Sequence, residues 1–344
     1  MLETKTRPLW RFSDFVVEEL PQLLVNDIGV IPSRAEEILR GLEPAILSSA
    51  HQSNRELALL DLKMAESAII RTTDDDKHSR VPVILSNTVD WFCGDGLNIP
   101  ALQYHELVEV NPLSDMRTFS TGEIRQSEKL FYNSHRVIEH RLSRVLQVCE
   151  DFLSSPEPDS QYTHGYESMF DFAPIENVLN ALRDRMPTDH FMFFRKYISK
   201  PCPVRDFDGP SGAYSCRIPY LESLFWGNKL PKTYVDDIRN KIIYYSPEGI
   251  QKLSKRISEL NESNCIVGYS NEIPEVIESV KFFIKFMKTF RNSHMGAVRK
   301  HLPELLDDKM EGTSGNAEAG TFLKNRITTI DDVYAEYLAE HVGA

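Results

Sequence analysis

Residues 275–302, with the sequence EVIESVKFFIKFMKTFRNSHMGAVRKHL, have the pattern of one long, uninterrupted helix. Apolar residues recur along one face at intervals of three or four positions, which is the periodicity of an amphipathic helix. His294 occupies a position on that face where an apolar residue is expected, and Arg291 lies one turn before it. An imidazole on an apolar face needs either a hydrogen-bond partner or a bound ligand. The stretch therefore predicts a helix that presents one histidine for a specific interaction.

The rest of the chain is also mostly helical in pattern. A short apolar run at Val81–Leu85 favours a strand, and the polar, turn-rich segment from Asn111 to Gly122 is typical of a domain boundary. We therefore predict an all-α protein with a small, mostly helical N-terminal domain (residues 1–115) and a larger C-terminal helical bundle (residues 116–344). The expected helices cover residues 34–42, 54–71, 127–152, 175–185, 189–199, 218–227, 234–245, 246–261, 275–302 and 321–341.

Composition and charge exclude several classes of protein. The 344 residues are 41% hydrophobic and 26% charged, with a net charge of −12, as in ordinary globular proteins. No basic stripe is present for a nucleic acid, and no apolar run approaches the ~20 residues that cross a membrane. Residues 1–14 lack the apolar run of a signal peptide. The five cysteines are odd in number and widely spaced, so we expect free thiols and a cytoplasmic location.

The common catalytic motifs for phosphate binding, dinucleotide binding and hydrolysis are missing from the sequence. Shared metal coordination by two histidines is also unfavourable. His135 and His140 point in different directions on one helix, and His294 and His301 are about 10 Å apart along theirs. An iron that needs a single protein ligand remains compatible with the pattern.

Haem is such a cofactor, and residues 275–302 offer what it requires. Phe282, Phe283, Phe286 and Phe290 provide an aromatic wall, while a histidine nitrogen and a nearby arginine match an axial ligand and a propionate partner. The alternative is that His294 is a hydrogen-bonded structural residue of a helical core. The helix alone leaves both interpretations open.

Five further segments occur in an order that resembles a known family, the indoleamine/tryptophan 2,3-dioxygenase superfamily of haem proteins. The resemblance is closest to the branch typified by monodechloroaminopyrrolnitrin synthase (PrnB), and it covers about residues 100–340. Each motif is short, and their order is the specific part. The segments are HELVEVNPLSDMRTFSTG (105–122), PTDHFMFFRKY (187–197), DGPSGAYS (208–215), FRNSHM (290–295) and GTSG (312–315) followed by FLKNR (322–326).

On the iron side, the resemblance implies that His294 is the proximal ligand of haem b. Arg291 would be the partner of a haem propionate. Asp237 would accept a hydrogen bond from the other ring nitrogen of His294, which fixes the tautomer and increases electron donation to the iron. The spacing has slipped by about two residues there, so Asp236 is an equal candidate.

On the substrate side, the resemblance implies that Arg195 clamps the carboxylate of an amino-acid substrate. A guanidinium can form a paired, fork-shaped contact that lysine cannot reproduce, although the alternative for Arg195 is an exposed helix cation. Phe191 and Phe194 would pack on the substrate ring. Ser134 occupies the place of a distal hydroxyl, and either it or His135 would face the pocket, with ordinary helix packing as the alternative.

A glycine- and serine-containing loop and a second, glycine-rich loop complete the implied site. Ser211 and Gly212 would line the haem edge, and the alternative is a simple turn between helices. Thr313 would bond a substrate ammonium group or a propionate, and the alternative is an ordinary solvent loop.

His190 departs from the family pattern, which has phenylalanine there. If it faces the iron, it adds a catalytic group that can hydrogen-bond an oxidant or move a proton; otherwise it lies at the rim, bonded to Asp189 or water. The departure favours hydroxylation or oxidative rearrangement over simple indole cleavage.

The expected function is therefore a haem-dependent oxygenase of secondary metabolism. It would use O₂ or peroxide to oxidise an aromatic amino acid, either tryptophan- or indole-derived or tyrosine-like. The alternatives are tryptophan 2,3-dioxygenase-type ring opening, a non-catalytic haem-binding sensor, and a helical scaffold without a cofactor.

Overall fold

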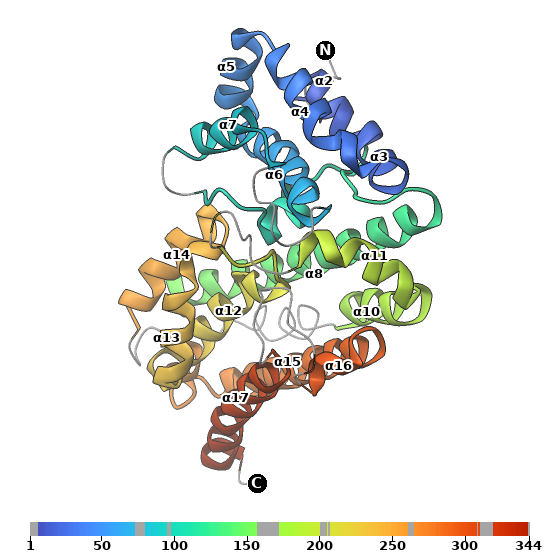
Figure 1. Ribbon diagram of the computed structural model, residues 1–344. Helices are drawn as coiled ribbons and strands as arrows, with labels where there is room; N and C mark the ends of the chain where they lie inside the picture. The colour runs from blue at the N-terminus through green and yellow to red at the C-terminus, as the bar shows by residue number, and fades with distance from the viewer. Residues whose placement is uncertain are drawn as a thin grey trace. The chain divides into compact units, whose positions relative to one another are not determined.

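The computed structural model describes residues 6–72, 80–94, 98–156, 172–199, 205, 207–260, 265–307, 309 and 319–342. Within this part of the chain the secondary structure is helical, and no β-strand occurs (Figure 1). The prediction of an all-α protein is confirmed. No helix among the described residues is both long and apolar enough to cross a lipid bilayer.

The chain forms two compact units, and neither is a continuous stretch of sequence. The first contains residues 1–133 and 185–214, together with 311–316, and the second contains residues 134–184, 215–310 and 317–344. The division at residue 115 that the sequence suggested stays a prediction.

The first unit is built around α6 (Arg55–Thr72), which is buried along most of its length. Helices from both earlier and later parts of the chain pack against it. The unit contains α2 (Arg11–Asp14), the π-helix η1 (Phe15–Glu19), α3 (Leu20–Asn26), η2 (Ile28–Val30), α4 (Ile31–Arg40), α5 (Pro44–Ser53), α6, α7 (Val83–Cys93), the π-helix η4 (Glu106–Val110), the first three turns of α8 (Gly122–Ser154), α11 (Thr188–Ile198) and η5 (Gly212–Tyr214).

The buried surface of α6 includes charged side chains, and each has a partner of opposite charge. Lys63 Nζ lies 2.5 Å from Glu106 Oε1. Glu66 Oε1 accepts from Arg205 Nη2 at 3.0 Å. The third charged residue, Asp61, is fully buried and belongs to a larger network. The helix is therefore held by compensated charges as well as by apolar contacts.

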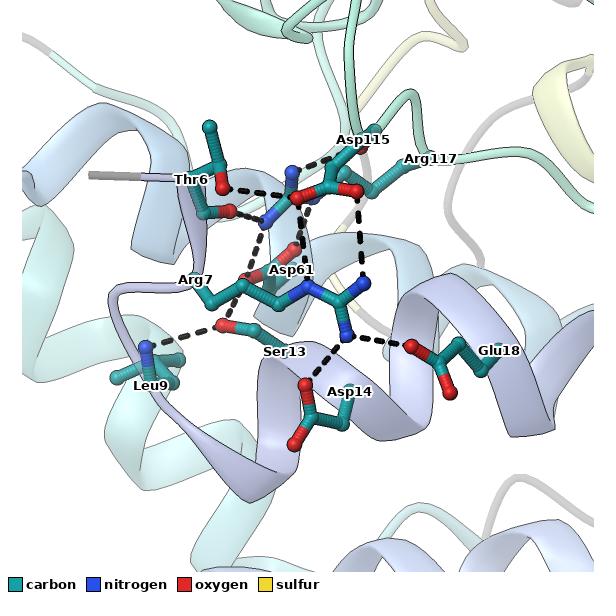
Figure 2. Close-up of polar contacts among 9 residues, drawn as sticks. All are labelled: Thr6, Arg7, Leu9, Ser13, Asp14, Glu18, Asp61, Asp115 and Arg117. Carbon is teal, nitrogen blue, oxygen red and sulfur yellow. Dashed lines mark hydrogen bonds and ion pairs between the residues drawn. The ribbon is translucent and has the colours of Figure 1, made fainter. Parts of the chain in front are cut away.

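Figure 2 shows the network around Asp61. Arg117 donates from Nε to Asp61 Oδ1 at 2.7 Å and from Nη2 to Oδ2 at 3.2 Å. Arg117 also donates to the backbone carbonyls of Asp115, at 2.9 Å, and Thr6, at 2.5 Å. Ser13 Oγ donates to Asp61 Oδ2 at 2.6 Å. The N-terminal segment is thereby fixed to α6 through polar contacts that leave few donors unused.

One predicted element of this unit is wrong. The apolar run Val81–Leu85 was expected to be a strand, but α7 begins at Val83, directly after Pro82 at the N-cap position. A run of five residues is too short to reveal its periodicity, and proline is compatible with a helix start. Contacts of α7 with α4 and α6 stabilise the helix.

The second unit has α15 as its longest complete helix. α15 begins with Pro274 and ends directly before Leu302 and Pro303, close to the predicted limits 275 and 302. The unit contains the rest of α8, α10 (Ala173–Arg185), α12 (Arg217–Trp226), η6 (Gly227–Lys229), α13 (Lys232–Asn240), η7 (Ile242–Tyr244), α14 (Pro247–Ser258), η9 (Ile266–Tyr269), α15 (Pro274–His301), α16 (Pro303–Leu306) and α17 (Ala319–Val342).

An aromatic core holds the first half of α15. Phe283 stacks on Phe225 of α12 with ring centroids 3.8 Å apart, and it meets Tyr334 of α17 edge-on at 6.4 Å. The ring centroids of Trp226 and Tyr334 are 5.3 Å apart. These rings are all buried, so this half of the helix is rigidly anchored between α12 and α17.

Candidate functional site

The half of α15 that carries His294 is packed less closely than the half before it. Phe283 and Met287 are fully buried, whereas the residues of 288–300 are half-buried or exposed. Phe290 and His294, which continue the apolar face, keep part of their surface accessible. An apolar face that the protein covers only partly is a natural place for a ligand.

The imidazole of His294 is neutral at physiological pH. The pKa of His294 is lowered from 6.5 to about 4, mainly because burial disfavours the charged ring, and nearby His135 lowers it further. The ring lies nearly parallel to that of Phe290, with centroids 6.2 Å apart. No hydrogen bond to either ring nitrogen occurs among the described residues. The ring therefore has a lone pair available for a metal.

These features fit an axial haem ligand and do not fit a site for a bare metal ion. In the described part of the chain, no three His, Cys, Asp or Glu side chains gather as ligands. A haem iron needs only one protein ligand on the proximal side. A neutral histidine beside an aromatic ring, on a partly covered apolar face, is compatible with such a ligand and with part of the wall.

Arg291, one turn before His294, contacts a carboxylate of the protein. Its Nη2 donates to Oε1 of Glu222 on α12, and the side chain of Glu222 is fully buried. Arg291 Nη1 lies 3.4 Å from the Tyr334 hydroxyl, and the guanidinium lies 5.7 Å from the centre of that ring. Tyr234 donates its hydroxyl to the other oxygen of Glu222. Glu222 could not be predicted as a partner, because it is 69 positions from Arg291 in the sequence.

The two candidate partners of His294 on α13 have other contacts. Asp237 Oδ1 lies 2.6 Å from Lys241 Nζ, and Asp236 Oδ1 lies 3.2 Å from Arg239 Nη1. No hydrogen bond joins either carboxylate to His294 among the described residues. Each aspartate is paired with a cation three or four positions further along the chain, and its predicted role beside His294 stays a prediction.

Ser134 on α8 is buried, at 1% exposure, and its hydroxyl has no hydrogen-bond partner within the described chain. A hydroxyl buried without a partner is unfavourable by about 1–3 kcal/mol. Such an atom is expected where a ligand or a water completes the contact. The neighbouring His135 is only partly buried.

Most predicted substrate-side residues lie on α11 in the first unit. Phe191 and Phe194 are buried, and both contact Phe131 of α8, with ring centroids 5.6 Å and 5.5 Å away. Arg195 is also buried, with 6% of its surface exposed, which contradicts the alternative of an exposed helix cation. The structure therefore brings a buried guanidinium and an aromatic cluster together on one helix.

His190 lies in the first turn of the same helix and has a hydrogen bond to a serine. Its Nδ1 lies 2.9 Å from the hydroxyl oxygen of Ser127 on α8. The expected rim contacts were Asp189 or water, so Ser127 is a partner that the sequence did not reveal. This hydrogen bond fixes the ring and leaves Nε2 to donate or accept a proton, depending on the tautomer.

The predicted Gly/Ser loop forms the short helix η5 in the first unit. Ser211 is buried, and its hydroxyl accepts from the Ala213 amide at 3.2 Å. Gly212 is exposed, and a side-chain carbon added there would lie 3.8 Å from Tyr104, an ordinary contact distance. Thr313 lies outside the described residues.

Glu128 of α8 is a buried acid that sequence reasoning missed. Its carboxylate accepts from the Phe119 amide at 2.9 Å and 3.0 Å, from the Tyr132 hydroxyl at 2.9 Å and from the Ser120 hydroxyl. Burial nevertheless raises the pKa of Glu128 from 4.5 to about 7. The four contacts are all neutral donors, so no cation compensates the ionised form among these contacts.

A small recess of the first unit offers a different, more polar environment. It is lined by both charged and hydroxyl-bearing side chains of α6 and α11, among them Lys63, Glu66, Ser67 and Tyr197. Lys63 and Glu66 already have the ion-pair partners described above. The recess therefore has polar walls, and the charges of Lys63 and Glu66 in them are compensated within the protein.

The predicted site residues are divided between the two units. His190, Phe191, Phe194, Arg195, Ser211 and Gly212 belong to the first, whereas Ser134, Asp237, Arg291 and His294 belong to the second. No protein-family model matches the chain, and no curated protein matches it. The functional assignment therefore depends on the chemistry of these residues and on the motif order.

Proposed function

We propose that this protein is a haem-dependent oxygenase of the indoleamine/tryptophan 2,3-dioxygenase superfamily. Its substrate would be an aromatic amino acid or an indole-derived compound, and its oxidant O₂ or peroxide. Hydroxylation or oxidative rearrangement is the favoured reaction class, because His190 adds an ionisable group where relatives of the closest branch have phenylalanine.

One observation carries the proposal: the state of His294. Its ring nitrogens have no hydrogen bond among the described residues, and its pKa of about 4 keeps the ring neutral. A structural histidine of a helical core would be expected to have a hydrogen-bond partner. The partly accessible face of α15 around it supports the same interpretation.

Haem, when bound, would supply the oxidation chemistry, and the protein would supply binding, orientation and polarity. His294 would provide the nitrogen that holds the haem iron. Arg195, buried on α11, would hold a substrate carboxylate through two parallel hydrogen bonds, which is favourable for a guanidinium away from water. Phe191 and Phe194 would pack on the substrate ring and exclude water.

His190 would serve as the proton-transfer group. The contact of Nδ1 with Ser127 orients the ring, so that Nε2 would be the atom that gives or takes a proton. This role is what distinguishes the favoured reaction from ring opening. Product mass separates the two: one or no added oxygen atom for hydroxylation or rearrangement, and two for a formylkynurenine-type product.

A haem-binding sensor without turnover is the second candidate function. The same state of His294 would serve it, but a sensor of diatomic gases has no use for a buried guanidinium such as Arg195. A shift of the haem absorption band on addition of aromatic amino acids supports the enzyme. Constant spectra across that series, with haem bound, would favour the sensor.

The most informative experiment is an absorption spectrum of the purified protein, oxidised and reduced, with and without tryptophan. A haem spectrum that responds to tryptophan is the expected result. A colourless protein that takes up no added haem would exclude the proposal and leave a helical scaffold.

We further propose a cytoplasmic location. Cys93 and Cys149 are free thiols in the structure, and Cys202 lies outside the described residues. Free thiols are typical of a reducing compartment.

A further inference from the structure

The guanidinium of Arg291 has an internal carboxylate as its counter-ion. Glu222 is 0% exposed, and its two oxygens accept from different donors, Oε1 from Arg291 and Oε2 from the Tyr234 hydroxyl. Tyr334 covers one face of the guanidinium, whose side chain is 10% exposed. All four residues belong to the second unit.

Taken by themselves, these four residues carry no net charge, and Lys288 and Asp331 lie near Tyr334 with charges of opposite sign. The four are one cation, one anion and two phenols. A carboxylate of a bound ligand that approached Arg291 would be a second anion on the same guanidinium. Away from bulk water the repulsion between two carboxylates is strong, because the effective dielectric constant is low.

We propose that Glu222 competes with a carboxylate of the bound porphyrin for Arg291. Glu222 would thereby limit the affinity of the protein for porphyrins that carry free propionates. The inference rests on the proposed haem function and adds a residue that determines ligand charge preference. It assigns Glu222 a role that no motif in the sequence indicates.

The alternative is that Glu222 and Arg291 only anchor α15 to α12. The two roles predict opposite effects of Glu222→Gln, which removes the charge and keeps the shape. If Glu222 competes, its neutralisation leaves Arg291 available and tightens porphyrin binding. If the pair is only an anchor, the same change loosens α15 and weakens binding.

The experiment is a titration of the full-length apoprotein with iron protoporphyrin, followed by absorbance. Glu222→Gln should bind about tenfold more tightly than wild type, the equivalent of one additional charge-assisted hydrogen bond. The matched control is Glu139→Gln, which breaks another ion pair of the second unit, with Arg217 at 2.6 Å. The control should bind with unchanged affinity.

A second ligand isolates the role of the carboxylates. The iron porphyrin dimethyl ester has both propionates blocked, so Glu222→Gln should bind it as wild type does. An equal or weaker affinity of Glu222→Gln for the free acid would overturn the inference. The inference would also be overturned if Glu222→Gln bound the dimethyl ester more tightly than wild type by the same factor.

A milder variant, Tyr234→Phe, keeps the inference testable if Glu222→Gln fails to fold. Tyr234→Phe removes a hydrogen bond from Glu222, which leaves more of its charge directed at Arg291. Binding of the free acid should then become two- to threefold weaker, opposite in sign to Glu222→Gln. Unchanged or tighter binding in this variant would contradict the competition.

The outcomes separate this inference from the proposed function. If wild type binds the free-acid porphyrin and the Glu222→Gln and Tyr234→Phe variants bind it with the same affinity, the inference about Glu222 is wrong and the proposed function stands. If wild type binds neither porphyrin, the haem function fails and the inference fails with it.

Discussion

The network around Asp61 in the first unit and the surroundings of His294 in the second both contain an ionisable side chain with restricted access to water. Asp61 has a bidentate contact with Arg117 and a further donor from Ser13. His294 has a ring contact with Phe290 and no hydrogen bond among the described residues. The first is complete within the protein, whereas under the proposed function the second is completed by a ligand.

The difference indicates where function is to be sought in this molecule. The buried charged residues of α6, Asp61, Lys63 and Glu66, each have an ion-pair partner, so their expected role is stability. The neutral imidazole on α15 contributes no hydrogen bond to stability among the described residues. Substitutions in the two regions should therefore separate stability from ligand binding.

The largest effect on stability is expected for Arg117→Ala. The change leaves Asp61 fully buried without its cation, which should lower the free energy of unfolding by about 3–5 kcal/mol. Denaturant unfolding measures it. Replacing both residues by apolar ones of similar size, Asp61→Leu with Arg117→Met, should recover much of the loss. A single variant as stable as wild type would show that the network is not structural.

Glu128 is a buried acid whose hydrogen-bond donors, described above, include no cation. Its pKa of about 7, above the ordinary 4.5, means that the folded state prefers the protonated form. The stabilisation is complete below pH 4.5 and is lost as the pH rises to 7, about 3 kcal/mol over that range. Wild type should lose this amount relative to Glu128→Gln in unfolding experiments at pH 4.5 and 7. Parallel pH profiles would contradict the assignment.

Arg195 is buried like Arg117 but is predicted to serve the substrate. Arg195→Ala should weaken substrate binding about 10- to 100-fold, with the haem spectrum unchanged. Arg195→Lys should not restore binding, because lysine cannot form the paired contact. Spectroscopic titration with aromatic amino acids measures both. Equal substrate affinity in the alanine variant would remove Arg195 from the site.

The smallest effect is expected at Asp237. Its pair with Lys241 is partly exposed, so Asp237→Asn should change the free energy of unfolding by less than about 0.5 kcal/mol. The haem spectrum and haem affinity should also stay unchanged. A tenfold or greater loss of haem affinity would restore Asp237 as the partner of His294.

Helices were predictable where the apolar pattern continues over many residues. The limits of α15 follow from its apolar spacing and from Pro274 and Pro303, and the helix agrees with the expected limits to within one residue at each end. The run Val81–Leu85 was too short for that, and its helical state depends on packing against α6.

The site was predictable only in part, because a sequence pattern reveals neighbours on one helix and not partners that tertiary packing brings together. His294 and Arg291 lie on one helix, so their spacing reveals them together. Glu222 and Ser127 contact Arg291 and His190 across long separations in sequence. Such partners are brought together by tertiary packing, and a single sequence contains no local signal for them.

The most direct test of the account compares haem binding by wild type and His294→Ala. Apoprotein is titrated with iron protoporphyrin, and absorbance and far-ultraviolet circular dichroism are recorded. We expect a stoichiometric complex with the spectrum of a histidine-ligated haem in wild type, and no stable complex in the variant at unchanged helical content. Equal binding and equal spectra in the two proteins would contradict the assignment of His294 as the iron ligand.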